Sequence, residues 1–327
     1  MMIEIKGKLF SVCAGAALLL LGGANVALAQ ITNEWISGET MARLTVDGTL
    51  TISGSGAMGN YHHSSDAPWY YSRYDIKRII IVYGVTSIGN NAFSHCTNIT
   101  TMRIPGSVTS IGNYAFSYSG LTSLTIPGSV THIDRTAFQS CNHLTSINVD
   151  DSNADYSSIK GVLYNKIQTV LRFCPAGKSG VFTIPDGVKS IANGAFARCR
   201  RLTSIVFPLS ILFIDDYAFQ ECSGLTSVTL PYGITDIKAG LFYECSGLTS
   251  VSIPKNVTSI ENYAFFGCSR LTTVTNRSSV PQPITTEVFQ DVNKDNITLR
   301  VPASAIGYYS VAEGWKLFGR IISIQNR

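Results

Sequence analysis

Histidine and cysteine are the side chains best able to do chemistry in this 327-residue chain. The five histidines are His62, His63, His95, His132 and His143. None of them lies in a Gly-x-Ser-x-Gly, His-Glu-x-x-His or phosphate-loop motif, the patterns that indicate hydrolysis or nucleotide chemistry. His95 precedes Cys96, a pair that could form an activated thiol nucleophile. However, Cys96 belongs to a spaced set of cysteines that we expect in the core, where thiols are unreactive. The sequence therefore predicts a protein that is not an enzyme and needs no cofactor.

The chain has seven cysteines after residue 29. They are Cys96, Cys141, Cys174, Cys199, Cys222, Cys245 and Cys268, the last four at intervals of 23 residues. Chain segments stacked about 4.8 Å apart would permit disulfides between neighbouring cysteines. Parallel side chains do not point at one another, however, and small thiols pack well in a core. Metal binding requires ligands that converge on one point. We therefore predict buried free thiols and no metal site.

Two acidic segments have residues that calcium could use. The pattern Asp291-x-Asn293-x-Asp295 matches the start of an EF-hand loop, but Asn296 replaces the turn glycine of that loop. The aspartates of residues 150–155 lack the loop's fixed spacing. We predict polar turns in both segments, and the sequence leaves calcium binding open.

The cysteine spacing reflects an internal repeat of 23 residues, which must position all these side chains. The segment Leu225-Thr-Ser-Val-Thr-Leu-Pro231 returns as Leu248-Thr-Ser-Val-Ser-Ile-Pro254. Apolar first, fourth and sixth positions predict a short strand buried on one face, which the proline ends. The following Val-x-x-Ile and Tyr-Ala-Phe segments predict an extended corner and a short helical or 3₁₀ turn. One unit cannot bury its own apolar side, so about eight units are expected to stack into a solenoid, an α+β repeat fold. The repeated phenylalanines are Phe93, Phe116, Phe138, Phe196, Phe219, Phe242, Phe265 and Phe289.

The segments around the repeats complete the predicted domain organisation. Residues 1–29 have the charged start, apolar run and Ala-Leu-Ala site of a signal peptide. We expect an N-terminal cap at 30–75 around a hairpin turn at Asp47-Gly48, the solenoid at 76–296, and a strand-helix-strand cap at 297–327, with its helix at 303–318. A hairpin insertion at about 150–180 is expected to stand out from the stack. No later apolar run is long enough to span a membrane, so we expect an exported protein, extracellular or on the cell surface, with the periplasm as an alternative.

The composition limits the kind of partner. Only 14% of the residues are charged and the formal net charge is +4, while 36 serines and 29 threonines supply much of the polar surface. No basic run is longer than Arg198–Arg201, so we do not expect the protein to bind nucleic acid. We expect recognition by shape and hydrogen bonding over a long surface.

Stacking would align the outward residues of the strands into a continuous, weakly charged surface of hydroxyl groups. The predicted ligand-binding residues on it are Ser123, Thr125, Ser146, Asn148, Ser204, Ser227, Thr229, Ser250 and Ser252. Small hydroxyl residues also suit exposed strands that bind nothing. Trp69 and Tyr70, in the aromatic segment 68–74, are further candidates. They would either stack against a sugar ring or plug the open end of the solenoid.

The unit Leu-Thr-Ser-Val-Thr-Ile-Pro-x-x-Val-Thr-Ser-Ile-x-x-Tyr-Ala-Phe-x-x-Cys resembles the repeat of the BspA-like leucine-rich repeat family of exported bacterial proteins. The flanking segments Ile52–Met58, Gly161–Gly177 and Leu299–Phe318 are also similar to those of the family. The resemblance implies a leucine-rich-repeat solenoid. Because members are associated with attachment to host matrix proteins, host cells and other bacteria, it also implies an adhesin-like protein that binds a matrix or cell-surface protein through the extended face. The alternative is a glycan-binding subunit of a nutrient-capture system.

Overall fold

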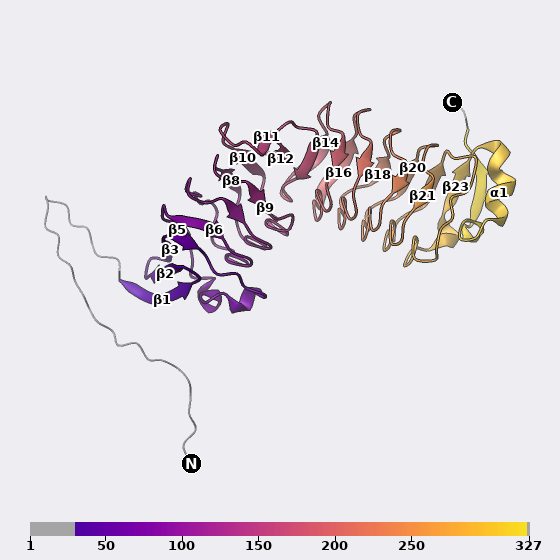
Figure 1. Ribbon diagram of the computed structural model, residues 1–327. Helices are drawn as coiled ribbons and strands as arrows, with labels where there is room; N and C mark the ends of the chain where they lie inside the picture. Colours follow the sequence, from indigo (N-terminus) through magenta and orange to yellow (C-terminus); the bar gives the residue numbers. More distant parts are fainter. Residues whose placement is uncertain (1–29, 326–327) are drawn as a thin grey trace, which may run out of the picture.

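The computed structural model describes residues 30–325, and the expected signal peptide at 1–29 lies outside this part. The chain winds into an elongated, curved stack of coils, with residue 30 and the C-terminal cap at opposite ends (Figure 1). Each coil places one strand on the same side of the stack. From the N-terminal end these are β3 (Thr49–Gly54), β5 (Arg78–Ile81), β8 (Ser123–Ile126), β10 (Ser146–Val149), β14 (Ser179–Thr183), β16 (Arg201–Val206), β18 (Ser227–Thr229), β20 (Ser250–Ile253), β22 (Thr273–Asn276) and β23 (Thr298–Val301).

The Val-x-x-Ile corners of the coils form a second row of shorter strands. It consists of β4 (Gly56–Ala57), β6 (Val85–Ile88), β7 (Ser110–Ile111), β9 (His132–Ile133), β15 (Ser190–Ile191), β17 (Phe213–Ile214), β19 (Asp236–Ile237) and β21 (Ser259–Ile260). Where neighbouring strands of a row are paired, they pair in parallel, as β18 with β20 and β19 with β21 do. The repeat solenoid that the sequence predicted is therefore confirmed, although the stack holds about ten coils and not eight.

The alternation within each unit explains which side of a strand is buried. In the unit that contains β8, Leu121, Leu124 and Ile126 are buried, while Thr125 between them is exposed. Burial of such aliphatic side chains against the next coil supplies the main stabilising free energy, about 1.5–3 kcal/mol for each fully buried side chain.

The Tyr-Ala-Phe segments form short turns with hydrogen bonds of the 3₁₀ type, three residues apart, but without a regular helix. Tyr114 and Tyr118 have φ values of 53° and 56°, the left-handed region that ends helical geometry. Between them, the Ala115 and Ser117 N–H groups donate within the turn, to the carbonyls of Gly112 at 3.3 Å and Tyr114 at 3.0 Å, while the Phe116 N–H donates to the Ala137 carbonyl of the next coil at 2.9 Å. The turn is therefore stabilised by hydrogen bonds within it and by hydrogen bonds to the next coil.

The repeated phenylalanines stack along the axis of the solenoid. The ring centroids of Phe242 and Phe265 are 5.6 Å apart with an angle of 16° between the ring planes. All seven cysteines of the described chain are buried and free, as predicted, and several thiols donate to the carbonyl of a phenylalanine in the preceding coil, as Cys245 does to Phe219 at 3.0 Å.

The insertion does not stand out from the stack, which corrects the expectation for residues 150–180. It consists of β11 (Tyr156–Ile159), β12 (Val162–Asn165) and β13 (Val170–Phe173), joined in antiparallel order. β13 then pairs in parallel with β15 of the next coil, and Val162 and Leu163 are buried. The hairpin is part of the stack because its apolar residues fill the core, and it joins two core clusters, one on each side.

The two ends of the stack are covered by different elements. At the N-terminal end β1 (Ile31–Ser37), β2 (Thr40–Thr45) and β3 form an antiparallel meander, followed by the 3₁₀ turns η1 (Ser64–Asp66) and η2 (Tyr70–Ser72). At the C-terminal end η3 (Lys294–Asn296) precedes β23, and η4 (Ala303–Ala305), α1 (Ile306–Val311) and η5 (Trp315–Leu317) precede β24 (Arg320–Ser323). The helix expected over 303–318 is thus a six-residue α-helix between two 3₁₀ turns.

Candidate binding surface

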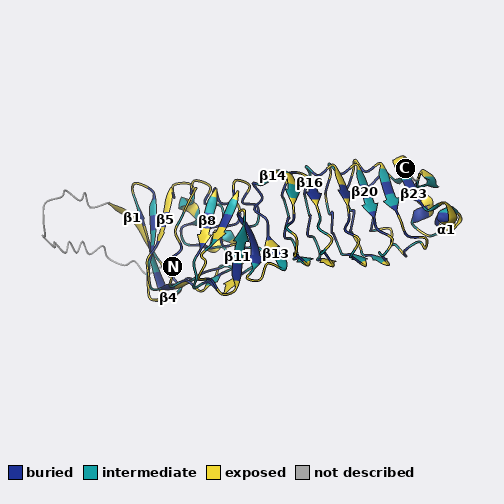
Figure 2. Ribbon diagram, turned by 90° about the horizontal axis from the view of Figure 1, so that it is seen from above, coloured by how far each residue is buried: buried dark blue, intermediate teal, exposed yellow. Residues whose placement is uncertain are grey.

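The strand side of the solenoid brings the predicted hydroxyl residues together in aligned rows, which we call the hydroxyl face. Ser227 and Thr229 on β18 lie beside Ser250 and Ser252 on β20. These rows continue on β22 with Thr273 and Thr275. Nearer the N-terminus, Ser123 and Thr125 on β8 lie beside Ser146 and Asn148 on β10. Seen from above, the strands lie across the long axis of the stack, and exposed and partly buried residues alternate with buried ones (Figure 2).

The hydroxyls of this face differ from the threonines just before them. The threonine at the second position of the unit donates its hydroxyl to the carbonyl of the preceding coil, as Thr249 does to Thr226 at 2.9 Å and Thr272 to Thr249 at 3.3 Å. In the part of the chain that the structure describes, the hydroxyls of Ser227, Thr229 and Ser250 have no protein partner. The same holds for Ser123, Thr125, Ser204 and Ser252. The unit therefore has one hydroxyl that holds coils together and others that remain available to a ligand.

The hydroxyl face is not continuous, which corrects one expectation, and it includes two arginines. The ladder is divided into separate sheets, β8 with β10, β14 with β16, and β18 with its C-terminal neighbours. The hairpin lies at the first of these breaks, between β10 and β14. Arg103 lies in the row of Thr125, and Arg300 lies in the row of Thr275. Sequence reasoning missed these arginines, although the alignment of Ile99-Thr-Thr-Met-Arg-Ile-Pro105 with the other units places Arg103 at the position of Thr125.

Trp69 is part of the core of the N-terminal cap and not of its surface. Its side chain is 1% exposed, its indole N–H donates to the Ala92 carbonyl at 2.7 Å, and its ring stacks on Phe93 at 5.9 Å. The geometry therefore corrects the suggestion that Trp69 stacks on a sugar, because neither ring face is accessible. Tyr70 is half-buried, with the Arg73 guanidinium 3.9 Å from its ring centroid, whereas Tyr71 is 85% exposed.

Of the groups considered for chemistry, the cysteines are buried, whereas His62, His63 and His95 line one open pocket. Burial raises the pKa of Cys96 to about 12 and that of Cys141 to about 11, which keeps both thiols protonated. The His95 ring is stacked on Tyr118 at 4.7 Å, and partial burial lowers its pKa. Among residues 30–325, no three His, Cys, Asp or Glu side chains are grouped so that they could hold a metal ion. Over the same residues, no helix has the length and apolar character needed to cross a membrane.

Comparison with known families identifies the repeat. The family model described as "BspA type Leucine rich repeat region" matches in six copies, over residues 66–168 and 173–312. No curated protein matches the chain.

Two solved structures have the same fold at low sequence identity. A leucine-rich repeat protein from Eubacterium ventriosum is 23% identical and superposes with a TM-score of 0.51, covering 89% of this chain and 95% of that one. The pneumococcal vaccine antigen PcpA is 16% identical, with a TM-score of 0.56 over 91% of this chain and 100% of its own. At these identities the likeness concerns the fold alone.

Proposed function

Since the chain belongs to the BspA-type leucine-rich repeat family, we propose that it is an exported, non-catalytic, adhesin-like protein that binds a matrix or cell-surface protein through the hydroxyl face. The signal-peptide pattern of residues 1–29 supports the export. The extended surfaces of solenoid proteins serve in general as binding surfaces.

The observation that carries this proposal is the row of hydroxyls without an intramolecular partner. Ser227, Thr229, Ser250 and Ser252 repeat their positions from coil to coil on paired strands. One hydrogen bond contributes only about 0.5–1.5 kcal/mol, so useful affinity requires many such contacts along the stack. A protein surface or an extended chain provides donors and acceptors over that length, and the arginines at both ends of the face add charge-assisted contacts.

The proposal can be tested on the chain 30–327 with surface plasmon resonance against immobilised matrix proteins and, in parallel, polysaccharides. The double variant Ser227→Glu/Ser250→Glu places two carboxylates in the hydroxyl face. We expect it to bind at least about tenfold more weakly. The matched control is Ser246→Glu/Ser269→Glu, since these two serines are also one repeat apart but lie exposed at the turns.

Equal weakening by both pairs, or the absence of any saturable binding to a matrix protein, would contradict the proposal. The exposed Tyr71 supports glycan binding as the second candidate, because sugars stack on accessible aromatic rings. Saturable binding of a polysaccharide that is lost in Tyr71→Ala and retained in Ser227→Glu/Ser250→Glu would replace the first proposal with the second.

A further inference from the structure

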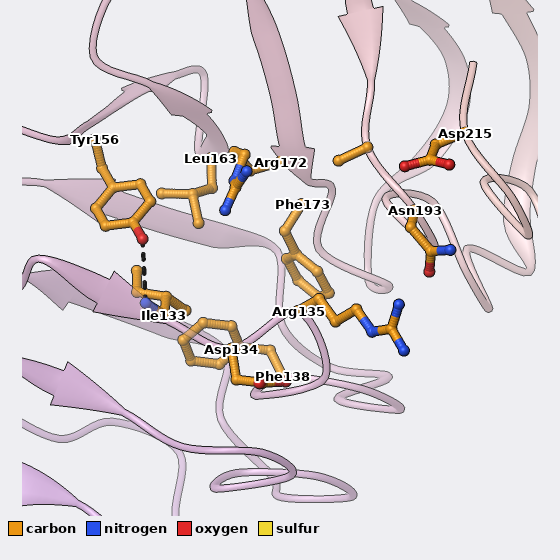
Figure 3. A pocket seen from close by; sticks show the side chains of 11 residues that line it. Ile133, Asp134, Arg135, Phe138, Tyr156, Leu163, Arg172, Phe173, Asn193 and Asp215 are labelled. Carbon is orange, nitrogen blue, oxygen red and sulfur yellow. Dashed lines mark hydrogen bonds between the residues drawn. The ribbon is translucent and has the colours of Figure 1, made fainter. Parts of the chain in front are cut away.

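The row of Tyr-Ala-Phe turns has one gap, between the turn at 134–142 and the turn at 192–200. The coil between them carries the hairpin β11–β12 in place of a turn. Cavities of about 210 Å³ and 190 Å³ open there and share Arg135, Phe173 and Asn193. Figure 3 shows the first of them, with Arg135 reaching past Phe173 toward Asn193. We call this space, bounded by Arg135, Gln139, Phe173, Asn193 and Ala197, the turn cleft.

Elsewhere in the stack, adjacent turns are joined by backbone hydrogen bonds in a fixed pattern. The N–H of the turn phenylalanine donates to the carbonyl of the residue before the next phenylalanine: Phe116 to Ala137 at 2.9 Å, and Phe196 to Ala218 at 2.8 Å. The N–H two residues later continues the pattern, as in the bond from Tyr118 to the Gln139 carbonyl at 3.1 Å. Each turn therefore presents N–H groups toward the C-terminal end of the stack and carbonyls toward the N-terminal end.

At the turn cleft this pattern is incomplete on both walls. Within residues 30–325, the N–H groups of Phe138 and Ser140 have no acceptor, and the carbonyls of Asn193 and Ala197 have no donor. The Ala195 carbonyl between them is used by the insertion and accepts from Cys174 at 2.7 Å. Phe138 and Ser140 are buried, and buried backbone groups are nearly always paired, so this wall is suited to a ligand that supplies acceptors. The carbonyls of Asn193 and Ala197, which are partly exposed, can accept from donors of the same ligand.

Side chains in the turn cleft add a second requirement. The Gln139 side-chain carbonyl is buried without a hydrogen-bond partner in the described chain. Arg135 and Arg172 line the first cavity together with Asp134 and Asp215, but neither guanidinium group forms an ion pair with a described residue. Phe173 provides an apolar surface between these arginines. Guanidinium groups bind carboxylates in paired hydrogen bonds, whereas the free amide oxygen requires a donor.

We propose that the turn cleft binds an extended segment of another polypeptide that carries a carboxylate side chain. Its backbone N–H groups would reach the carbonyls of Asn193 and Ala197 and the Gln139 amide oxygen, as an added strand pairs with a free edge, and its carboxylate would lie against Arg135. A peptide fits better than a sugar. In the other coils, carbonyls at the positions of Asn193 and Ala197 accept from backbone N–H groups of the neighbouring turn, and a peptide supplies N–H groups of the same kind and spacing. Arg198 closes one end of the cleft, since its guanidinium crosses to the Tyr118 hydroxyl at 2.8 Å.

A peptide selection tests this site directly. A phage-displayed library of linear peptides is selected on the immobilised chain 30–327, and the enriched peptides are synthesised and titrated against variants by fluorescence polarisation. Ala197→Tyr fills the cleft. The equivalent turn position holds Tyr243 and Phe266 in other coils, whose rings stack at 4.6 Å, so this variant should fold. The matched control is Gln290→Tyr, at the same turn position in the last repeat.

We expect enriched peptides rich in Asp and Glu that bind at least about tenfold more weakly to Ala197→Tyr and to Arg135→Ala, with unchanged binding to Gln290→Tyr. Bound peptide should also slow hydrogen exchange of the amides in 136–142. Three outcomes overturn the proposal. The selection enriches no peptide, the enriched peptides bind the Ala197→Tyr variant with the same affinity as the original chain, or a polysaccharide binds in their place and its binding is lost in the Ala197→Tyr variant. If Ala197→Tyr fails to give the circular dichroism of the original chain, the exposed Arg135→Ala decides alone.

Discussion

Removal of one phenylalanine ring from the stack tests how the coils are held together. Phe242 is fully buried between Phe219 and Phe265, with ring centroids 5.5 Å and 5.6 Å away and interplanar angles of 11° and 16°. Phe242→Leu keeps an apolar side chain but loses both ring contacts. Each aromatic pair contributes about 0.5–1.5 kcal/mol beyond the area that it buries. We therefore expect a loss of about 1–3 kcal/mol in the free energy of unfolding from the two contacts.

A double-mutant cycle separates this contact energy from general loss of packing. The single and double leucine variants of Phe242 and Phe265 should show a coupling of about 0.5–1.5 kcal/mol, since these rings touch. The control cycle uses Phe196 and Phe265, which are three coils apart and share no stacked ring, so they should be additive within about 0.5 kcal/mol.

The measurement is urea unfolding of the chain 30–327, followed by circular dichroism and by fluorescence. The two signals must give coincident transitions for a single free energy of unfolding to apply. A coupling for Phe242 and Phe265 no larger than that of the control cycle would refute the stacked geometry.

Three other substitutions test the core, the cleft and the cap. Burial raises the pKa of Cys245 from its ordinary value near 9.0 to about 12. Between these two pH values, the thiol loses its proton in the unfolded chain and keeps it in the folded one. The stabilising contribution of the thiol is therefore complete below pH 9 and is lost as the pH rises. Urea unfolding between about pH 9.5 and 11 should therefore show stability falling more steeply than in Cys245→Ala, by about 1.4 kcal/mol per pH unit, and parallel curves would disprove this. Arg198→Ala removes the ion pair with Glu221 and the hydrogen bond to Tyr118, and it should lower the free energy of unfolding in urea by about 1–3 kcal/mol. Arg43→Ala, at an exposed ion pair, is the control and should lower it by less than about 1 kcal/mol. Equal losses would contradict a role for Arg198 in joining the two walls of the turn cleft. Trp69→Ala should cost about 3–5 kcal/mol in thermal unfolding, and the exposed Tyr71→Ala less than about 0.5 kcal/mol; a stable Trp69→Ala would show that this ring is not part of the core.

The strands were predictable because their signal is local. Leu121, Leu124 and Ile126 alternate with polar residues, and a period of two identifies a strand with one buried face. The hydroxyl residues between them are outward for the same reason. The sequence predicted a short turn after each corner, but not that it stops short of a regular helix, because the left-handed backbone at Tyr114 and Tyr118 directs alternate N–H groups to the neighbouring coil.

The divided hydroxyl face and the turn cleft could not be predicted from the unit alone. The sequence places Arg103 and Arg300 in units far apart, and only the register of the stack places them in rows with Thr125 and Thr275. The backbone carbonyls of Asn193 and Ala197 are likewise unpaired only because of the coil that lies next to them. Sequence patterns describe a coil, but not the position at which a coil without a turn interrupts the row.

The repeat, its period of 23 residues, the buried row of phenylalanines and cysteines, and the solvent-facing side of each strand can all be read from the amino-acid order. These features follow from which residues are apolar and how far apart they stand, because each coil must bury the same positions. The folded structure was needed to show that the hairpin joins the core, that Trp69 is buried, and that a cleft opens between two turns. Those outcomes depend on contacts between segments that are distant in the chain, and Arg198 at Tyr118, 80 residues away, is one such contact.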